Sequence, residues 1–180
     1  MIMSSSLVIL KVNNINNLDS ILKDTAFEDN ESFIALSFDS TEKNTGELHW
    51  SNSFKFGKMN MIYFIREEEY FYLFTSAVDN KKILRKALDD ISGGETELET
   101  LKPPLFSKIS SEFSIPEIER YDINKHFGIS AWLRLSNWHG LVKIYTNGLI
   151  TYKMTNNKDV LKEIINISKI LINQCRQEIE

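Results

Sequence analysis

The chain is poor in the residues that build disulfides, linkers and membrane spans. Its 180 residues include one cysteine, Cys175, three prolines and seven glycines. A single cysteine cannot form an intramolecular disulfide, which favours a reducing compartment, so we expect a cytoplasmic location. No apolar run approaches the roughly 18 residues that a membrane helix requires, and no membrane association is expected.

The chain also lacks the local motifs of common catalytic and metal sites. His49, His126 and His139 are not at ligand spacing, and no phosphate loop, nucleophile elbow, zinc-protease motif or calcium loop is present. Cys175 continues an apolar helical stripe near a helix C-terminus, where a thiolate is disfavoured. We expect no metal, no cofactor and no catalytic residue. A scattered acid–base site would leave no local motif, so an enzyme is disfavoured but stays open.

What the chain does contain is a recurring order of strand, turn, strand and amphipathic helix, in residues 61–91 and 138–168. The first hairpin turns at the charged residues 66–69, and the second turns at Asn147-Gly148, a pair that favours a tight hairpin because both residues tolerate positive φ. The last helix should span residues 158–177. Its apolar stripe should pack on the sheet; it consists of Leu161, Ile164, Ile165, Leu171 and Ile172. Either one unit was duplicated or one domain uses the motif twice.

The pattern predicts an α+β fold: an antiparallel sheet of about seven or eight strands with amphipathic helices on one face, built as two pseudo-repeated hairpin-helix halves. The first half, 1–92, reads β-α-β-β-β-β-α, with a helix over 18–27 that Asn17 would cap. An irregular, acidic, proline-containing connection covers 93–117. The second half, 118–180, opens with a short helix over 118–127 and continues with three strands and the long helix. Together they should form one compact domain.

Charge is unevenly distributed along the chain, although the net charge is only −4. Residues 120–176 carry nine basic and three acidic side chains, whereas residues 91–119 carry two basic and six acidic ones. Such asymmetry can steer an anionic partner to one face, although it is more often a solvated surface that the acidic segment balances in space. The candidates for contacts with an anionic partner are Arg134, Lys143, Lys153 and Lys158.

The three tryptophans are candidates for a partner-binding surface, because tryptophan is enriched among the residues that dominate interface energies. Trp50 and Trp132 lie on predicted strands, and either could instead belong to the core. Trp138 lies beside His139 in a predicted turn over 136–140, so we expect it to be exposed. His139 is included as the fourth candidate.

The run from Ile144 to Ile150, with Asn147-Gly148 at its turn and a helix after it, is similar to the hairpin of TATA-binding-protein repeats. The resemblance implies nucleic-acid binding by a basic saddle. This chain departs from that pattern, because it is net acidic and carries Glu67-Glu68-Glu69 at the corresponding turn of its first hairpin. Similar hairpin-helix units occur in longin-like and roadblock-like interaction domains, so we assign no family.

Three classes of function follow from these observations. The first is a non-enzymatic protein-binding or adaptor domain, favoured by the aromatic content, the uneven charge and the lack of catalytic motifs. The second is a nucleic-acid-binding module that uses the basic region 120–176, which the net charge disfavours. The third is a small-molecule pocket or an enzyme without a local motif. The expected partner is another protein, with a homo-oligomer as a further option.

Overall fold

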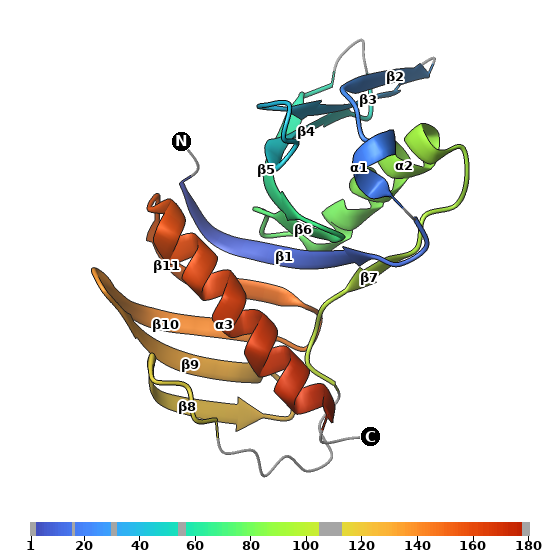
Figure 1. The fold of residues 1–180 in the computed structure, drawn as a ribbon. Helices are drawn as coiled ribbons and strands as arrows, with labels where there is room; N and C mark the ends of the chain where they lie inside the picture. Colours follow the sequence, from blue (N-terminus) through green and yellow to red (C-terminus); the bar gives the residue numbers. More distant parts are fainter. Residues whose placement is uncertain (1–2, 16, 30–31, 54–56, 105–112, 178–180) are drawn as a thin grey trace. The chain divides into compact units, whose positions relative to one another are not determined.

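The computed structural model describes residues 3–15, 17–29, 32–53, 57–104 and 113–177 (Figure 1). Its strands form an antiparallel sheet with the hydrogen-bonded order β2-β3-β4-β5-β6-β1-β11-β10-β9-β8, and β7 pairs with β1 beside this path. The strands are β1 (Ser4–Val12), β2 (Thr25–Asp29), β3 (Ser32–Phe38), β4 (Thr45–Ser51), β5 (Asn60–Glu67), β6 (Tyr70–Leu73), β7 (Leu98–Thr100), β8 (Ile118–Asn124), β9 (Gly128–Leu135), β10 (Trp138–Tyr145) and β11 (Leu149–Thr155). The helices are α1 (Leu18–Ile21), the 3₁₀ turn η1 (Val78–Asn80), α2 (Lys81–Ser92) and α3 (Lys158–Gln177).

The expected sheet of seven or eight strands with helices on one face is wrong, because the described residues form eleven strands. The three strands missed by sequence reasoning are β2, β7 and β8. We expected β2 to be the end of a helix, β7 to be part of an irregular connection and β8 to be a short helix. A hairpin followed by a helix does occur twice, at β5–β6 with α2 and at β10–β11 with α3. However, α2 has 12 residues and α3 has 20, and nothing in the structure shows a duplication.

The chain divides into two compact units, one of residues 9–100 and one of residues 1–8 with 101–180. We call them the 9–100 unit and the 101–180 unit. Sequence reasoning placed the halves at 1–92 and 118–180, with a connection over 93–117. In the structure β7, within that connection, pairs its Leu98–Thr100 with Leu10–Val12 of β1. Strand β1 therefore begins in one unit, where it pairs with β11, and ends in the other.

The core of the 9–100 unit lies between α2 and the face of the sheet that α2 covers (Figure 1). Leu84, Ala87 and Leu88 of α2 are fully buried. Phe64 and Phe71 are also fully buried, with ring centroids 5.5 Å apart. Strand β6 lies between β5 and β1, which explains why its central residues are apolar without alternation.

Helix α1 is much shorter than expected, since it ends at Ile21 rather than near residue 27. Thr25 and Phe27 pair with Leu36 and Ile34 of β3, so sheet pairing overrides the helical spacing of the apolar residues. Asn17 does precede the helix, in a left-handed conformation with φ of 56°, but its side chain makes no capping hydrogen bond.

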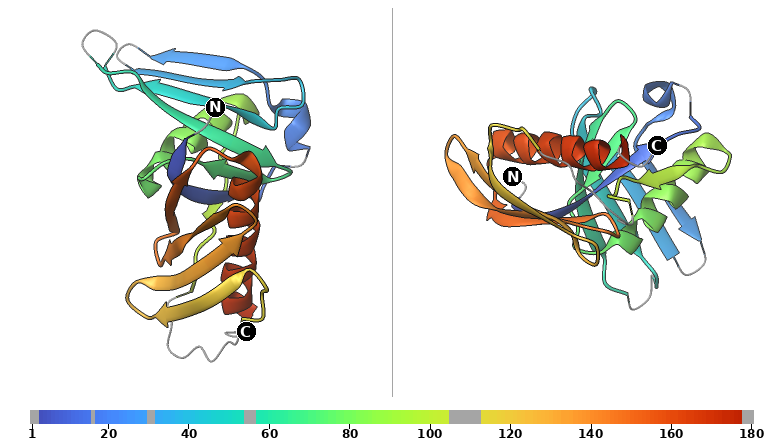
Figure 2. Two further views of the ribbon diagram at one scale, coloured as in Figure 1. Left: turned by 90° about the vertical axis from the view of Figure 1, so that its left-hand side faces the viewer. Right: turned by 90° about the horizontal axis from the view of Figure 1, so that it is seen from below.

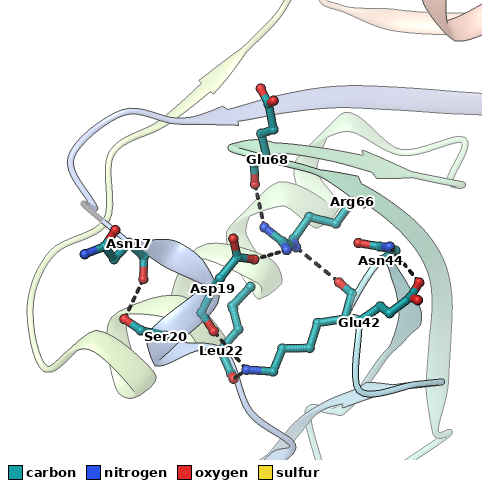
Figure 3. A network of polar contacts seen from close by, with 9 residues as sticks. Asn17, Asp19, Ser20, Leu22, Glu42, Asn44, Arg66 and Glu68 are labelled. Carbon is teal, nitrogen blue, oxygen red and sulfur yellow. Dashed lines mark hydrogen bonds and ion pairs between the residues drawn. The ribbon is translucent and has the colours of Figure 1, made fainter.

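A buried arginine, Arg66, joins α1 to two turns of the sheet (Figure 3). Its side chain is almost inaccessible and forms an ion pair with Asp19 of α1. The guanidinium also donates from Nε to the carbonyl oxygen of Lys43 at 3.1 Å and from Nη1 to that of Glu68 at 2.6 Å. Lys43 in turn donates from Nζ to the carbonyl oxygen of Asp19 at 2.9 Å. The residues expected to form only a charged turn thus include the central polar anchor of this unit.

We predict that Asp19→Ala lowers the free energy of unfolding by roughly 2–3 kcal/mol, because the buried guanidinium loses its counter-charge; the exposure of Asp19 makes this less than for a fully buried pair. Chemical denaturation measures the change. The control is Asp79→Ala, which removes an ion pair to Lys82 whose side chains are both largely exposed. That control should change stability by less than about 1 kcal/mol. Equal effects in the two variants would contradict the anchoring role of Arg66.

The core of the 101–180 unit lies under α3, which runs along the concave side of strands β8 to β11 (Figures 1 and 2). The predicted bounds of this helix are confirmed, as is the burial of Leu161, Ile164, Ile165, Leu171 and Ile172. Cys175 is buried on the same helix. On β11, the Tyr152 hydroxyl donates a hydrogen bond to Ser4 Oγ at 2.9 Å, and burial raises the pKa of this tyrosine to about 12.

The hairpin of β10 and β11 exists, but its turn differs from the one predicted. Ile144 pairs with Ile150, and Gly148 donates its backbone N–H to the carbonyl oxygen of Tyr145 at 2.9 Å. Gly148 has a φ of 92°, whereas Asn147 is not at positive φ. The loop therefore has three residues, 146–148, rather than the two predicted, and the positive φ predicted at Gly148 is confirmed.

Because only Gly148 needs the left-handed conformation, Gly148→Val should destabilise the protein by more than about 1 kcal/mol. Thermal unfolding tests this. Gly94→Val is the control, since Gly94 has open space around its Cα and does not lie in the left-handed region. Unchanged unfolding of the Gly148 variant would show that the loop accepts another conformation.

Candidate functional site

Strand alternation gives the sheet of the 101–180 unit one face toward α3 and one face away from it. On β10, Trp138, Val142 and Ile144 are buried, whereas His139 and Lys143 are exposed and Leu141 is half-buried. On β9, Ile129, Ala131 and Leu133 are buried, and Ser130, Trp132 and Arg134 alternate with them. We call the second set, Ser130, Trp132, Arg134, His139, Leu141 and Lys143, the outer face.

The pairing register arranges the outer face in three rows across the strands. Lys143 lies opposite Ser130, which lies opposite Asp122 of β8. Leu141 lies opposite Trp132, which lies opposite Arg120. His139 lies opposite Arg134 in the third row. The middle row thus carries the large apolar and aromatic side chains and ends in Arg120, and the rows on both sides are polar or charged.

Trp132 is the centre of this surface. The guanidinium of Arg120 lies over its indole, 4.9 Å from the ring centroid, and the ring of His139 lies 5.5 Å away. Cation–π contact holds the arginine and the indole together and is worth about 0.5–1 kcal/mol at an exposed site. Trp132 is half-buried, so part of its large and rigid apolar side chain reaches solvent.

The carboxylate of Glu119, with the two side chains that bind it, lies at the edge of the outer face. Glu119 of β8 accepts a hydrogen bond from His139 Nε2 at 2.8 Å and forms an ion pair with Arg134. These two hydrogen bonds, that from His139 first, lower the pKa of Glu119 below its ordinary value. A β-bulge between Ile118 and Arg120 lets Glu119 and Arg120 both contact outer-face residues, although they are consecutive.

Two shallow hollows lie over this surface, on either side of Ser130. One, of about 330 Å³, is lined by Arg120, Asp122, Ser130, Trp132 and Leu141 together with Tyr121. The other, of about 260 Å³, is lined on its outer side by Asp122, Ser130, Lys143 and Tyr145. Ser130 lines both hollows, and its small side chain lies between the larger Lys143 and Asp122 on the neighbouring strands.

Four of the eight candidate residues lie together on the outer face: Trp132, Arg134, His139 and Lys143. Lys153 is exposed close to Gly140, and Lys158 is exposed at the start of α3. Trp50 is half-buried and lies in the other unit, on β4. Whether any of these residues contacts a partner stays a prediction.

Trp138, which we expected to be exposed in a turn, is only 8% exposed. The turn is limited to Ser136 and Asn137, and Trp138 is the first residue of β10, paired with Leu135. Its ring lies across Gly140, where a Cβ would come within 2.9 Å of the indole. The tryptophan therefore folds back over the strand, which the glycine permits.

Sequence reasoning did not select Arg120, Glu119 or Leu141. The alternation of apolar residues over 129–135 would have assigned Ser130, Trp132 and Arg134 to one face, and pairing through a two-residue turn would have added His139, Leu141 and Lys143. No comparable signal identified β8, because its bulge interrupts the alternation.

Across the described ranges, no three of the His, Cys, Asp and Glu residues are grouped so that they could hold a metal ion. The helices among the described residues are all too short or too polar to cross a membrane. Comparison of the chain with protein-family models, with curated proteins and with solved structures finds no match. The hairpin resemblance to TATA-binding-protein repeats therefore gains no support, and the site must be interpreted from its own geometry.

The different surroundings of two tryptophans give a direct test of which one is available at the surface. Trp138→Ala should lower the free energy of unfolding by about 3–5 kcal/mol, as for other buried aromatic residues. Trp132→Ala should lower the free energy of unfolding by roughly 1 kcal/mol, since only a partly buried side chain and one cation–π contact are lost. Chemical denaturation of both variants measures the difference. A larger loss for Trp132 would show that it is part of the core.

Proposed function

We propose that this protein is a non-enzymatic binding or adaptor domain that contacts another protein through the outer face of its 101–180 unit. The observation that carries the proposal is the position of Trp132, half-buried between Leu141 and Arg120 in the row between two rows of polar or charged side chains. Binding interfaces commonly combine a central aromatic or arginine anchor with a polar rim that excludes water. Trp132 with Arg120 would supply the anchor, and Arg134, His139 and Lys143 would supply the rim.

The second candidate function is binding of single-stranded nucleic acid, which requires aromatic stacking platforms and a basic groove. An exposed tryptophan among basic side chains favours it. Two observations make it the weaker candidate: Arg120 already occupies one side of the indole, and the carboxylates of Glu119 and Asp122 belong to the same surface. The hollows beside Ser130 are at or below the usual size of ligand pockets, about 300 Å³ and upward, so they support a small-molecule site less well.

The proposed setting is a reducing compartment such as the cytoplasm, on the basis of the single cysteine. A second copy of the chain is an alternative partner, and size-exclusion chromatography over a range of concentrations would reveal it. A concentration-dependent dimer that Trp132→Ala dissociates would replace the proposed hetero-partner with a homo-oligomer.

The proposal predicts that a photo-crosslinking amino acid at Leu141, in the middle row, captures a discrete protein in cells that express the chain naturally. The matched control places the same amino acid at Ile170, which is exposed on α3. Crosslinked products are identified by mass spectrometry. Trp132→Ala should remove the product from the Leu141 position. Crosslinks mainly to nucleic acid, or the same proteins from both positions, would contradict the proposal.

A further inference from the structure

The two units of the chain carry opposite net charge. Residues 9–100 contain 10 basic and 17 acidic side chains, a net charge of −7. Residues 1–8 and 101–180 contain 11 basic and 8 acidic side chains, a net charge of +3. The unit that carries the outer face is therefore basic in a chain that is acidic as a whole. Complementary potentials guide association and exclude partners of the wrong charge.

On the outer face itself, the charges are not equally available to a partner. Glu119 already has partners, because its carboxylate forms an ion pair with Arg134 and a hydrogen bond with His139. Arg120 and Lys143 form no ion pair with any residue that the structure describes, and the same is true of Asp122. The outer face and its β8 neighbours thus offer a partner two cations without an ion pair to a described residue, Arg120 and Lys143, and one such carboxylate, Asp122. Arg134 also keeps donors that Glu119 does not occupy, since a guanidinium has five.

The spacing of these groups matches an extended chain. Successive residues on one face of a strand are about 6.6–6.8 Å apart, so Lys143 lies one such step from Leu141 along β10. Arg134 lies one step from Trp132 along β9, on the opposite side of the middle row. A partner strand running along β9 and β10 would place one apolar side chain over Trp132 and Leu141. The partner residues two positions before and two positions after that side chain would then lie over Lys143 on one side and over Arg134 on the other.

From this arrangement, and on the basis of the proposed function, we infer that the partner contributes an extended acidic segment. In this segment, carboxylates flank one apolar side chain, in the order acidic, any, apolar, any, acidic. The apolar side chain packs on Trp132 and Leu141, and the carboxylates accept hydrogen bonds from Lys143 on one side and from Arg134 on the other. Arg120, at the end of the middle row, adds a further cation beside the bound segment. Asp122 lies opposite Ser130 in the same row as Lys143, so it repels a partner carboxylate on its side of the row and confines that carboxylate to the Lys143 side.

The inference is tested with a fluorescent peptide of repeating Glu-Ser-Leu-Ser units and a matched peptide in which Lys replaces Glu. Fluorescence polarisation with the full chain should show that the acidic peptide binds at least about tenfold more tightly. Arg120→Gln and Lys143→Gln should each weaken that binding about threefold or more, as expected for loss of one exposed charge pair. Lys162→Gln, an exposed lysine of α3 on the opposite side of the sheet, should leave it unchanged.

Equal binding of the two peptides, or no effect of the Arg120 and Lys143 substitutions, would overturn the inference. So would tighter binding of an oligothymidylate with a steep dependence on salt, which would instead indicate nucleic acid. The outcome is separable from that of the proposed function. If Leu141 crosslinks a protein but the acidic peptide shows no preference, only the charge of the partner is wrong. If the acidic peptide binds as expected but no protein is crosslinked, the proposed function fails.

Discussion

The strict alternation of side chains along β9 and β10, combined with the burial of one face under α3, determines what the 101–180 unit can do. Because α3 buries a continuous apolar stripe, every second residue of these strands must be apolar and packed. The remaining residues do not pack in the core under α3, so core packing does not restrict their type. They include Trp132, a large aromatic residue that the core does not need for packing. Its placement in solvent has a free-energy cost that binding of a partner would remove.

In the 9–100 unit, the comparable constraint is a single buried charge. Arg66 connects α1 and the turns at Lys43 and Glu68, which are distant from one another in sequence. A guanidinium suits this role because its planar group offers several donors in fixed directions. Lys43 and Glu68 both lie at positive φ, so the carbonyl groups that Arg66 binds belong to strained turns. The arginine stabilises local conformations that these residues would not adopt alone.

The sequence could predict those parts of the fold in which local pattern and tertiary packing agree. Helix α3 was predicted from near Lys158 to about Gln177, as it is found, because one apolar stripe repeats along it and Asn157 precedes it. Strand β2 was missed because Leu18, Ile21 and Leu22 suggest a helix, whereas pairing with β3 decides the outcome for Thr25 and Phe27. Of the outer face, Trp132, Arg134, His139 and Lys143 on the regular strands β9 and β10 were selected, whereas Ser130 and Leu141 were not. No residue of the bulged strand β8 was selected. A bulge depends on the partner strand and leaves no period in the sequence.

The cluster around Glu119 explains how a basic surface can still be selective. If the outer face carried only cations, any polyanion would bind it, because screening and counterion release do not depend on shape. Here Glu119 fixes Arg134 and His139 in one arrangement, and Trp132 fixes Arg120, so the cations have defined directions rather than long free side chains. Preorganised side chains lose less conformational entropy on binding, which favours partners whose carboxylates match their positions. Asp122 adds a repulsive element at the same surface, and attraction and repulsion together provide discrimination that net charge alone cannot.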